Sequence, residues 1–207
     1  MSKPRGNIKP AMNHQDSKEL RQELRAKRRA LSVKEQESAA LALFQQVTAL
    51  REFKSAKRIA FYLPSDSEIN PTAILNFALA QGQECFLPVL HPLRKDQMLF
   101  VRYLTGDTLK ANRWGILEPQ LSKDNHVKPQ SLDLVLVPLV GFDAQGGRLG
   151  MGKGFYDRAF AFKQRSSRRK PVLIGLAHEC QRVAELNREE WDVPMDKIIS
   201  DQQTYQP

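Results

Sequence analysis

The sequence predicts one α/β domain of the Rossmann-like type, with a largely parallel central sheet flanked by helices. Short β-type apolar runs alternate with segments of helical periodicity, and this order favours parallel strands joined by helical crossovers. The run from Leu132 to Val140 is almost continuously apolar, as expected for a central strand buried on both faces. A length of 207 residues suits one well-packed domain and is short for two.

Helical spacing defines the first two predicted elements. Large apolar residues recur among basic ones in a thin amphipathic stripe, at Leu20, Leu24 and Leu31. Ser32 and Glu35 then form a capping-box pattern, so a second helix is predicted from there to about Leu50. Residues 1–15 have basic residues but no apolar run behind them, so we expect a disordered tail and a single domain over residues 16–207.

Short β-type runs, several of them bounded by proline, give the predicted strands. They are Arg58 to Leu63, Cys85 to Leu87, Met98 to Leu104, Leu132 to Val140, Val172 to Ala177 and Ile198 to Ile199. The second strand is expected to end at Pro88, because proline cannot donate to a β-ladder. The stretch from Gly106 to Gln130 is predicted to be a loop.

Two further helices are predicted between these strands. Asn70 and Pro71 match an N-cap followed by proline at the first helical position, and Gly82 suits the position just beyond the C-terminus of that helix. The segment Phe155 to Phe162 also suits a helix. Ligands of such sheets bind at the carboxyl ends of the strands, so we expect the functional site there.

Positive charge is concentrated at the start of the chain, whose formal net charge is +9. Residues 1–58 hold 14 of the 32 Lys and Arg residues but only 6 of the 23 Asp and Glu residues. Such a basic arm is found in nucleic-acid-binding proteins, on solvated helix faces, and where a protein meets an anionic small molecule. Charge alone favours the solvated face and leaves the other two interpretations open.

Several kinds of chemistry have no support in the sequence. No apolar run approaches the roughly 20 residues that cross a bilayer. Cys85 and Cys180 lie in no CxxC or zinc-like cluster, and two lone cysteines favour a reducing cytoplasm. The four histidines stand in unrelated contexts and give no Ser–His–Asp or Cys–His order.

The predicted central strand runs directly into a glycine-rich, charged segment. Six glycines lie between Gly141 and Gly154, both included. Glycine lets the backbone approach an anion closely and turn its N–H groups inward. Arg148 and Lys153 add positive charge, and the helix predicted from about Gly154 adds its positive N-terminal end. A phosphate site is therefore predicted here, with a purely structural glycine loop as the alternative.

Asp157 lies one turn into that predicted helix, where a carboxylate suits Mg²⁺ bound to phosphate oxygens. The segment is not a P-loop, which requires GxxxxGK[ST], because Lys153 is followed by Gly154. It is not the dinucleotide-binding fingerprint either. The sequence thus predicts a Mg²⁺-assisted phosphate site that spans Arg148 to Asp157.

The same residues resemble the signature of the 5-formyltetrahydrofolate cyclo-ligase family, also called methenyltetrahydrofolate synthetases. The most specific part is Arg148-Leu149-Gly150-x-Gly152-x-Gly154-x-Tyr156-Asp157-Arg158, preceded by Val137-Pro138 and Gly141-Phe142-Asp143. Looser matches cover nearly all of the chain after Lys18, at Leu20-Arg21, Glu68, Leu87-Pro88, Trp114-Gly115-Ile116, Glu118-Pro119 and Asp192. The resemblance implies an α/β fold and an ATP-dependent ring closure.

In the implied reaction, 5-formyltetrahydrofolate and Mg–ATP give 5,10-methenyltetrahydrofolate, ADP and phosphate. The N5-formyl group is an amide, whose carbonyl is a poor electrophile. Attack of the formyl oxygen on the γ-phosphoryl group would give an imidate phosphate, from which N10 displaces phosphate. The work left to the enzyme would be positioning and neutralisation of charge.

The resemblance also implies a role for individual residues. Arg148 and Lys153 would be catalytic. ATP would contact Lys18, Arg21, Arg148, Leu149, Gly150, Met151, Gly152, Lys153, Gly154, Phe155 and Tyr156. The folate would contact Leu63, Glu68, Trp114, Met151 and Phe155, with Phe142 as further apolar surface. Mg²⁺ would be held by Asp157 and Asp192. The family pattern has a lysine four residues before the arginine at position 21, and here Ser17 stands there with Lys18 next to it.

Two other functions stay open at this level. One is a nucleic-acid-binding protein that uses the basic arm, and the other is a different Mg–ATP-dependent enzyme, such as a kinase, on the same scaffold. Under the cyclo-ligase interpretation we expect small-molecule substrates as the partners. We also expect no membrane or nucleic-acid partner, and a monomer in the cytoplasm.

Overall fold

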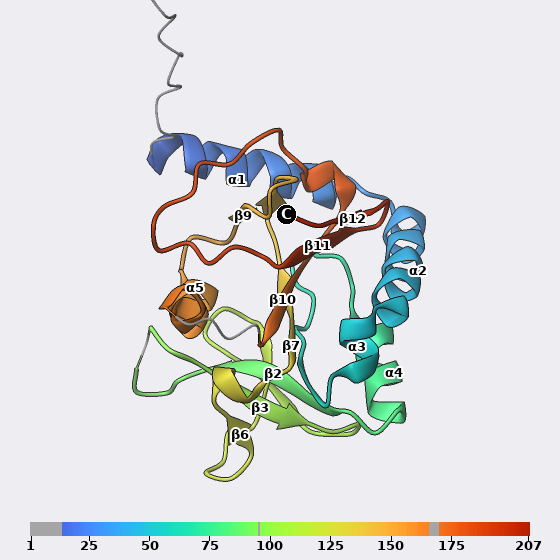
Figure 1. The fold of residues 1–207 in the computed structure, drawn as a ribbon, viewed down its shortest axis with the longest axis vertical. Coiled ribbons are helices and arrows are strands. Elements are labelled where there is room, and N and C mark those ends of the chain that lie inside the picture. The colour runs from blue at the N-terminus through green and yellow to red at the C-terminus, as the bar shows by residue number, and fades with distance from the viewer. Residues whose placement is uncertain (1–13, 95, 166–169) are drawn as a thin grey trace, which may run out of the picture.

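The computed structural model describes residues 14–94, 96–165 and 170–207 (Figure 1). The expected tail, residues 1–15, lies outside these ranges except for His14 and Gln15, with which the first helix begins. Within the described residues the main sheet has eight strands, in the spatial order β12 (Thr204–Tyr205), β11 (Lys197–Ser200), β10 (Val172–Ala177), β7 (Leu134–Pro138), β1 (Arg58–Ala60), β2 (Glu84–Leu90), β3 (Met98–Tyr103) and β6 (His126–Val127).

The centre of this sheet is parallel and its edges are antiparallel. β7 pairs in parallel with β10 and with β1, and these continue in parallel to β11 and β2. The outer strands β3, β6 and β12 are antiparallel to their neighbours. The predicted α/β class with a mostly parallel sheet is confirmed, and the strand predicted to be central lies in the middle.

Helices surround the sheet on both faces and at one end. They are α1 (His14–Arg29), α2 (Val33–Ala49), α3 (Arg51–Ser55), α4 (Thr72–Ala80) and α5 (Phe155–Phe160), with short 3₁₀ turns η1 (Pro129–Ser131), η2 (Ala161–Arg165) and η3 (Glu179–Gln181). Helices α2, α3 and α4 cover one face, α5 lies on the other, and α1 crosses the end where the parallel strands finish (Figure 1).

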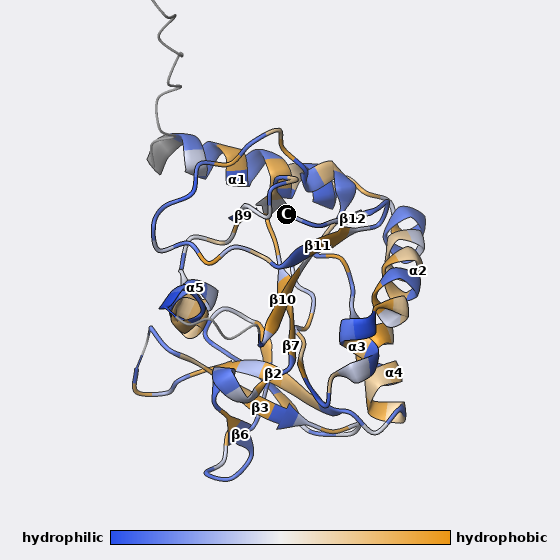
Figure 2. Cartoon of the chain, in the orientation of Figure 1, coloured by the Kyte–Doolittle hydropathy of each residue, from blue (hydrophilic) through white to orange (hydrophobic). Residues whose placement is uncertain are grey.

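Alternate residues of each central strand supply the two halves of the core. In β7, Leu134 and Leu136 pack toward α2 and α4, whereas Val135 and Val137 pack toward Phe160 of α5. All four strand residues are fully buried, which explains why this segment reads as a continuous apolar run. Figure 2 shows β7 and β10 as the hydrophobic centre of the molecule.

Local hydrogen bonds define where the helices begin. The predicted capping box is confirmed, since Ser32 Oγ accepts the Glu35 N–H at 3.3 Å and Glu35 Oε2 accepts the Ser32 N–H at 2.8 Å. The start predicted for α4 is wrong by one residue. Pro71 is its N-cap rather than its first helical residue, and Asn70 Oδ1 accepts the Thr72 N–H at 2.9 Å.

Two other expectations about strands are wrong. Pro88 does not end β2. Beyond Phe86, where pairing with β1 stops, β2 continues beside β3, and β1 needs no N–H donor from position 88. The N–H of Leu90, two residues further along the same side, donates to a side chain, Glu118 Oε1, at 3.2 Å. The segment Gly106 to Gln130 is not only a loop, since it contains the antiparallel hairpin of β4 (Leu109–Ala111) and β5 (Leu117–Pro119), as well as β6.

Candidate functional site

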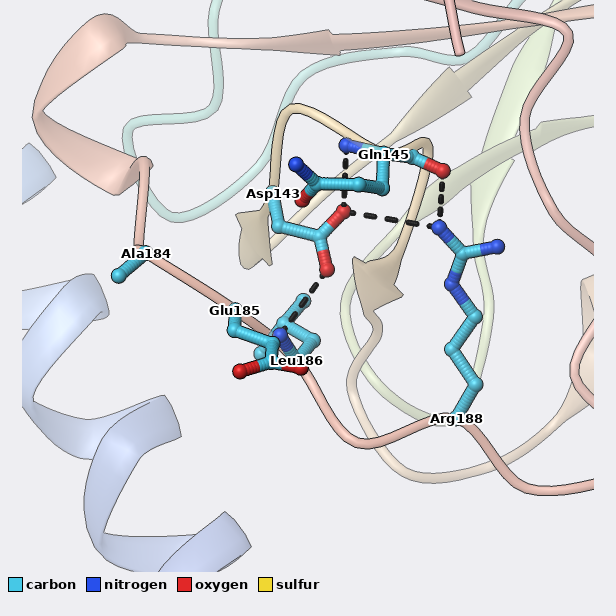
Figure 3. A pocket seen from close by; sticks show the side chains of 6 residues that line it. All are labelled: Asp143, Gln145, Ala184, Glu185, Leu186 and Arg188. Carbon is cyan, nitrogen blue, oxygen red and sulfur yellow. Dashed lines mark hydrogen bonds and ion pairs between the residues drawn. The ribbon is translucent and has the colours of Figure 1, made fainter. Parts of the chain in front are cut away.

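A second small hairpin, β8 (Gly141–Phe142) and β9 (Arg148–Leu149), carries the chain from the central strand to the glycine-rich turn. Asp143 holds the connection between its strands (Figure 3). Its Oδ1 accepts the N–H groups of Gln145 and Gly147 at 2.9 and 2.8 Å, and its Oδ2 accepts that of Leu186 at 2.9 Å. The Asp143 carboxylate is 2% exposed and is therefore committed to fixing the hairpin that delivers Arg148.

Arg148 and Asp157 form an ion pair across the turn, between Arg148 Nη2 and Asp157 Oδ1. Both are tied to Val193, whose carbonyl accepts from Arg148 Nε at 3.2 Å and whose N–H donates to Asp157 Oδ1 at 3.2 Å. The two side chains are only 7% and 18% exposed. This arrangement fixes the guanidinium and the carboxylate at one end of the turn, next to Asp192 in sequence.

Helix α1 contacts the same turn through Arg21. Arg21 Nε donates to the Gly150 carbonyl at 2.8 Å, and a Cβ on Gly152 would lie 3.5 Å from the Arg21 Cζ atom. Gly152 and Gly154 have φ values of 80° and 63°, in the left-handed region that favours glycine. Burial lowers the pKa of Arg21, and the nearby Asp192 carboxylate partly opposes that shift. The turn, Arg21 and Asp192 therefore share one neighbourhood.

Glu68 lies in the loop that follows β1, at the same edge of the sheet. Its side chain is 11% exposed, and its Oε2 accepts the Ser65 N–H at 3.1 Å. Burial raises the pKa of Glu68, although the charge of Arg28 and the hydrogen bonds from Ser65 act against the rise. Burial, and after it the Glu68 charge, raises the pKa of Tyr156 in α5. The Glu68 loop and the glycine-rich segment are thus close enough to interact electrostatically.

Aromatic side chains border the same region. Trp114, from the turn between β4 and β5, meets Phe155 edge to face with ring centroids 5.8 Å apart. Trp114 is 44% exposed and Met151 is 52% exposed, so both present apolar surface to solvent. Leu63 is partly buried against the core. Phe142 is fully buried against Tyr205, so it is a core residue.

The remaining predicted contacts lie around this turn. Lys18 is exposed on α1, three residues before Arg21, and Lys153 is exposed in the turn itself. Leu149 is buried with Leu24 and Val140 in a small cluster beneath α1. The structure therefore brings Arg21, Arg148 and Asp157 together at the glycine-rich turn and places Trp114 against Phe155, whereas Leu63 packs against the core.

The carboxylates can be compared with what Mg²⁺ requires. Asp157 Oδ1 is occupied by Arg148 and Val193, and Asp192 Oδ2 accepts the Glu189 N–H at 2.9 Å. Among the described residues, no group of three or more His, Cys, Asp or Glu side chains is arranged to hold a metal ion. One or two carboxylates are enough for Mg²⁺ that is also bound to substrate phosphates, so the donor set fits that mode of binding.

Two residues that shape the site, Asp66 and Arg28, are not among the predicted site residues. Asp66 pairs with Arg25, Arg28 and Arg29 of α1, and these hydrogen bonds lower its pKa although burial acts in the opposite direction. Arg28 is completely buried. A signal was present, because Arg28 stands four residues after Leu24, on the apolar stripe of its helix. A cation at a stripe position indicates a buried acidic partner.

The fold and this cluster of residues define a class of protein: an α/β enzyme with its site at the carboxyl edge of a mostly parallel sheet. The model of the 5-formyltetrahydrofolate cyclo-ligase family matches residues 13–201. The chain belongs to this family of ligases, for which ATP is a co-substrate.

Individual relatives match most of the chain. The chain is 40% identical to 5-formyltetrahydrofolate cyclo-ligase of Haemophilus influenzae over 91% of this chain and 99% of the relative. The corresponding values for the Escherichia coli K12 protein of that name are 34%, 86% and 96%.

Two solved structures share the fold. The 5,10-methenyltetrahydrofolate synthetase of Aquifex aeolicus superposes with a TM-score of 0.77 at 30% identity, over 92% of each chain. The synthetase of Mycoplasma pneumoniae gives 0.70 at 28% identity, over 90% of this chain and 99% of that one. In the part of the chain that the structure describes, no helix has the length and apolar character needed to span a membrane.

Proposed function

We propose that this chain catalyses the ATP-dependent closure of 5-formyltetrahydrofolate to 5,10-methenyltetrahydrofolate, with release of ADP and phosphate. One observation carries the proposal beyond family membership. The charged glycine-rich turn and the buried Glu68 loop both meet α1, the turn through Arg21 Nε, 2.8 Å from the Gly150 carbonyl, and the loop through Arg28 Nη1, 3.9 Å from Glu68 Oε1. Transfer of a phosphoryl group to a formyl oxygen requires the two substrates to lie in one such site.

The chemistry divides into two displacements. The formyl oxygen attacks the γ-phosphorus, an O–P bond forms, and the bond to the bridging oxygen breaks as ADP leaves. N10 then attacks the activated formyl carbon and loses its proton, and the C–O bond breaks as phosphate leaves. Negative charge builds up on the transferred group, so fixed positive charge at that position lowers the barrier.

Each residue of the turn has a part in this proposal. Arg148 and Lys153 neutralise the transferred phosphoryl group, and Arg21 and Lys18 contact the nucleotide phosphates. Support comes from the ion pair with Asp157, which presets the Arg148 guanidinium before substrate arrives. Backbone N–H groups of the segment 149–156 complete the phosphate site. Asp157 and Asp192 hold Mg²⁺, which neutralises phosphate charge when it is bound.

The folate occupies the neighbouring part of the site. Glu68 accepts hydrogen bonds from N–H donors of the pterin ring, while Leu63, Trp114, Met151 and Phe155 supply apolar surface. Trp114 and Met151 are exposed in the ligand-free protein, as expected for surface that a ring system covers.

The basic arm is explained by this proposal without nucleic acid. Arg25, Arg28 and Arg29 all pair with Asp66, and Arg21 bonds to the glycine-rich turn. We propose that the protein acts as a monomer. Cys85 and Cys180 are both free, in keeping with a reducing cytoplasm.

The deciding experiment follows near-ultraviolet absorbance of the methenyl product with 5-formyltetrahydrofolate, ATP and Mg²⁺. Product should form only when all three are present. A protein that binds ATP but forms no methenyl product would instead belong to a different ATP-dependent activity on this scaffold. Omission of Mg²⁺ with an added chelator is the matched control for the metal.

A further inference from the structure

Arg28 is a completely buried cation whose guanidinium lies near polar groups of three residues, Asp66, Leu139 and Glu68. Its Nε donates to the Asp66 carbonyl at 2.8 Å and its Nη2 to Asp66 Oδ2 at 2.7 Å. Its Nη1 lies 3.4 Å from the Leu139 carbonyl, just beyond the end of β7, and 3.9 Å from Glu68 Oε1. One guanidinium on α1 thus joins the central strand, the backbone of the loop after β1 and the Glu68 carboxylate.

The loop that Arg28 holds has an unusual backbone. Asp66 and Ser67 have φ values of 51° and 59°, which side chains other than glycine rarely adopt. Such conformations persist only where surrounding contacts hold them. Glu68 follows directly, and its N–H donates to the Ser65 carbonyl at 2.9 Å. The position of the Glu68 carboxylate therefore depends on the contacts that fix Asp66.

The groups around Glu68 differ in charge. Arg28 of α1 is positive, Asp66 of the same loop is negative, and Tyr62 and Tyr156 have pKa values raised first by burial and then by Glu68. His178, which follows β10, has its pKa lowered by burial, while the Asp201 charge and a backbone hydrogen bond with Ser67 act against that shift.

We propose that Arg28 is a positioning residue for the folate substrate, because it fixes the loop of residues 63–69 and supplies the counter-charge for the Glu68 carboxylate. The inference rests on the folate-binding role proposed for Glu68. Arg28 acts through that loop and makes no contact with the reacting atoms. An arginine is needed, since only its planar fork can bond to a carbonyl and a carboxylate of the same residue together.

The test compares Arg28→Met with Arg25→Met. Arg25 donates to the same Asp66 Oδ2 at 2.7 Å, but it is 31% exposed, so its loss removes a bond to the loop without removing a buried charge. For Arg28→Met we expect the KM for 5-formyltetrahydrofolate to rise about tenfold or more while the KM for ATP stays within about twofold. Arg25→Met should leave both within about twofold.

The pH dependence of kcat/KM for the folate distinguishes a positioning role of Arg28 from a general disturbance of the fold. Loss of the Arg28 charge removes an influence that lowers the pKa of Glu68, so the acid limb of kcat/KM for the folate should move to higher pH. Arg28→Lys keeps the charge but not the fork, so KM should rise with little movement of the limb. In a Glu68→Gln background, Arg28→Met should no longer move the limb.

The outcomes of these experiments decide whether Arg28 positions the folate-binding loop. A folate KM and an acid limb for Arg28→Met that match those of Arg25→Met would overturn the inference. So would a limb that still moves in the Glu68→Gln background. If Arg28→Met does not fold, Arg28→Lys decides, and an unchanged folate KM there counts against the proposal. Inactive wild-type protein would refute the proposed function itself, and a normal folate KM in Glu68→Gln would refute the role of Glu68.

Discussion

At the scale of single residues, two carboxylates that stand two positions apart have opposite environments. Asp66 receives hydrogen bonds from three arginines, and its pKa lies below the ordinary value. Glu68 is more deeply buried, with Arg28 3.9 Å away, and burial raises its pKa. Asp66 is therefore a structural anion, whereas ionisation of Glu68 is disfavoured by its burial. Shifts of that kind are typical of residues kept for binding or catalysis.

This difference predicts the effect of Glu68→Gln on stability. A carboxyl group whose pKa is raised in the fold favours folding when protonated, and that contribution is lost as pH rises through the folded pKa. Glu68→Gln should therefore raise Tm at pH 8, with a gain that shrinks as the pH falls below the pKa of Glu68. Thermal unfolding from pH 4 to 8 measures it. A Tm lowered equally at every pH would contradict the expectation.

The same variant should separate the two substrates. The KM for 5-formyltetrahydrofolate should rise because an acceptor for pterin donors is lost, whereas ATP binding should be unchanged. Isothermal titration with a non-hydrolysable ATP analogue checks the second part. Loss of nucleotide binding in Glu68→Gln would show that the roles have been assigned to the wrong sites.

For the ion pair in the turn, Arg148→Ala and Asp157→Ala should each lower kcat by about 10²–10³-fold. The first removes positive charge beside the transferred phosphoryl group, and the second removes the carboxylate that presets Arg148 and that would hold Mg²⁺. The losses should not add in the double variant, since the two side chains hold each other in place. Steady-state kinetics with circular dichroism as the folding control measures this. Near-normal kcat in both single variants would remove the phosphate site from this segment.

At the scale of elements, α1 is attached by a fully buried apolar side chain, Leu24, in addition to the buried Arg28. Leu24 packs with Val140, Leu149 and Leu186, and it lies so close to Gly141 that a Cβ there would collide with it. Leu24→Ala should cost about 2–4 kcal/mol of the free energy of unfolding. It should also weaken the binding of both substrates, because α1 carries Arg21 and Arg28.

Leu41→Ala on α2 is the matched control, as that leucine is 60% exposed. Its cost should be under about 0.5 kcal/mol, with unchanged kinetics. Chemical denaturation of both variants gives the comparison. Equal costs at the two positions would show that α1 is not anchored through Leu24.

Elements whose signals are local were predictable. The capping box of α2, the strand Val172–Ala177 and the turn glycine Gly82 follow from neighbouring residues and match the structure. The persistence of β2 through Pro88 was not predictable, since it depends on where a different strand stops. The hairpin of β4 and β5 was missed because its apolar residues, such as Leu117, stay exposed and show no alternation.

The features of the site also divide into those that the sequence predicts locally and those that depend on distant segments. The glycine-rich segment could be identified from the chain itself, because its residues are contiguous. The links from Arg148 to Val193 and from Arg28 to Asp66 join segments far apart in sequence, and no periodicity predicts them. The three-dimensional fold was needed to show that three arginines of α1 pair with one aspartate.

At the scale of the whole molecule, the two cysteines differ in how deeply they are buried. Cys85 is 1% exposed beneath α4, and burial raises its pKa to about 12. Cys180 is only partly buried. The thiolate is the reactive form, so at pH 8 a thiol reagent should modify Cys180 first and Cys85 only as the fold opens. A Cys180→Ser variant should not react with the thiol reagent until denaturant is added. Prompt labelling of Cys85 in that variant would mean that the structure around α4 opens locally.

The path of the chain sets the order in which the molecule can be completed during synthesis. Helix α1 packs on η3 and Leu186, and Arg28 reaches beyond the central strand to Leu139. About 150 residues separate α1 from η3, so at a typical elongation rate the ribosome needs on the order of ten seconds to supply the partner. Throughout that interval α1 lacks the partners on which it packs, η3 and Leu186. The docking of α1 on the carboxyl edge of the sheet therefore waits until most of the chain has been made.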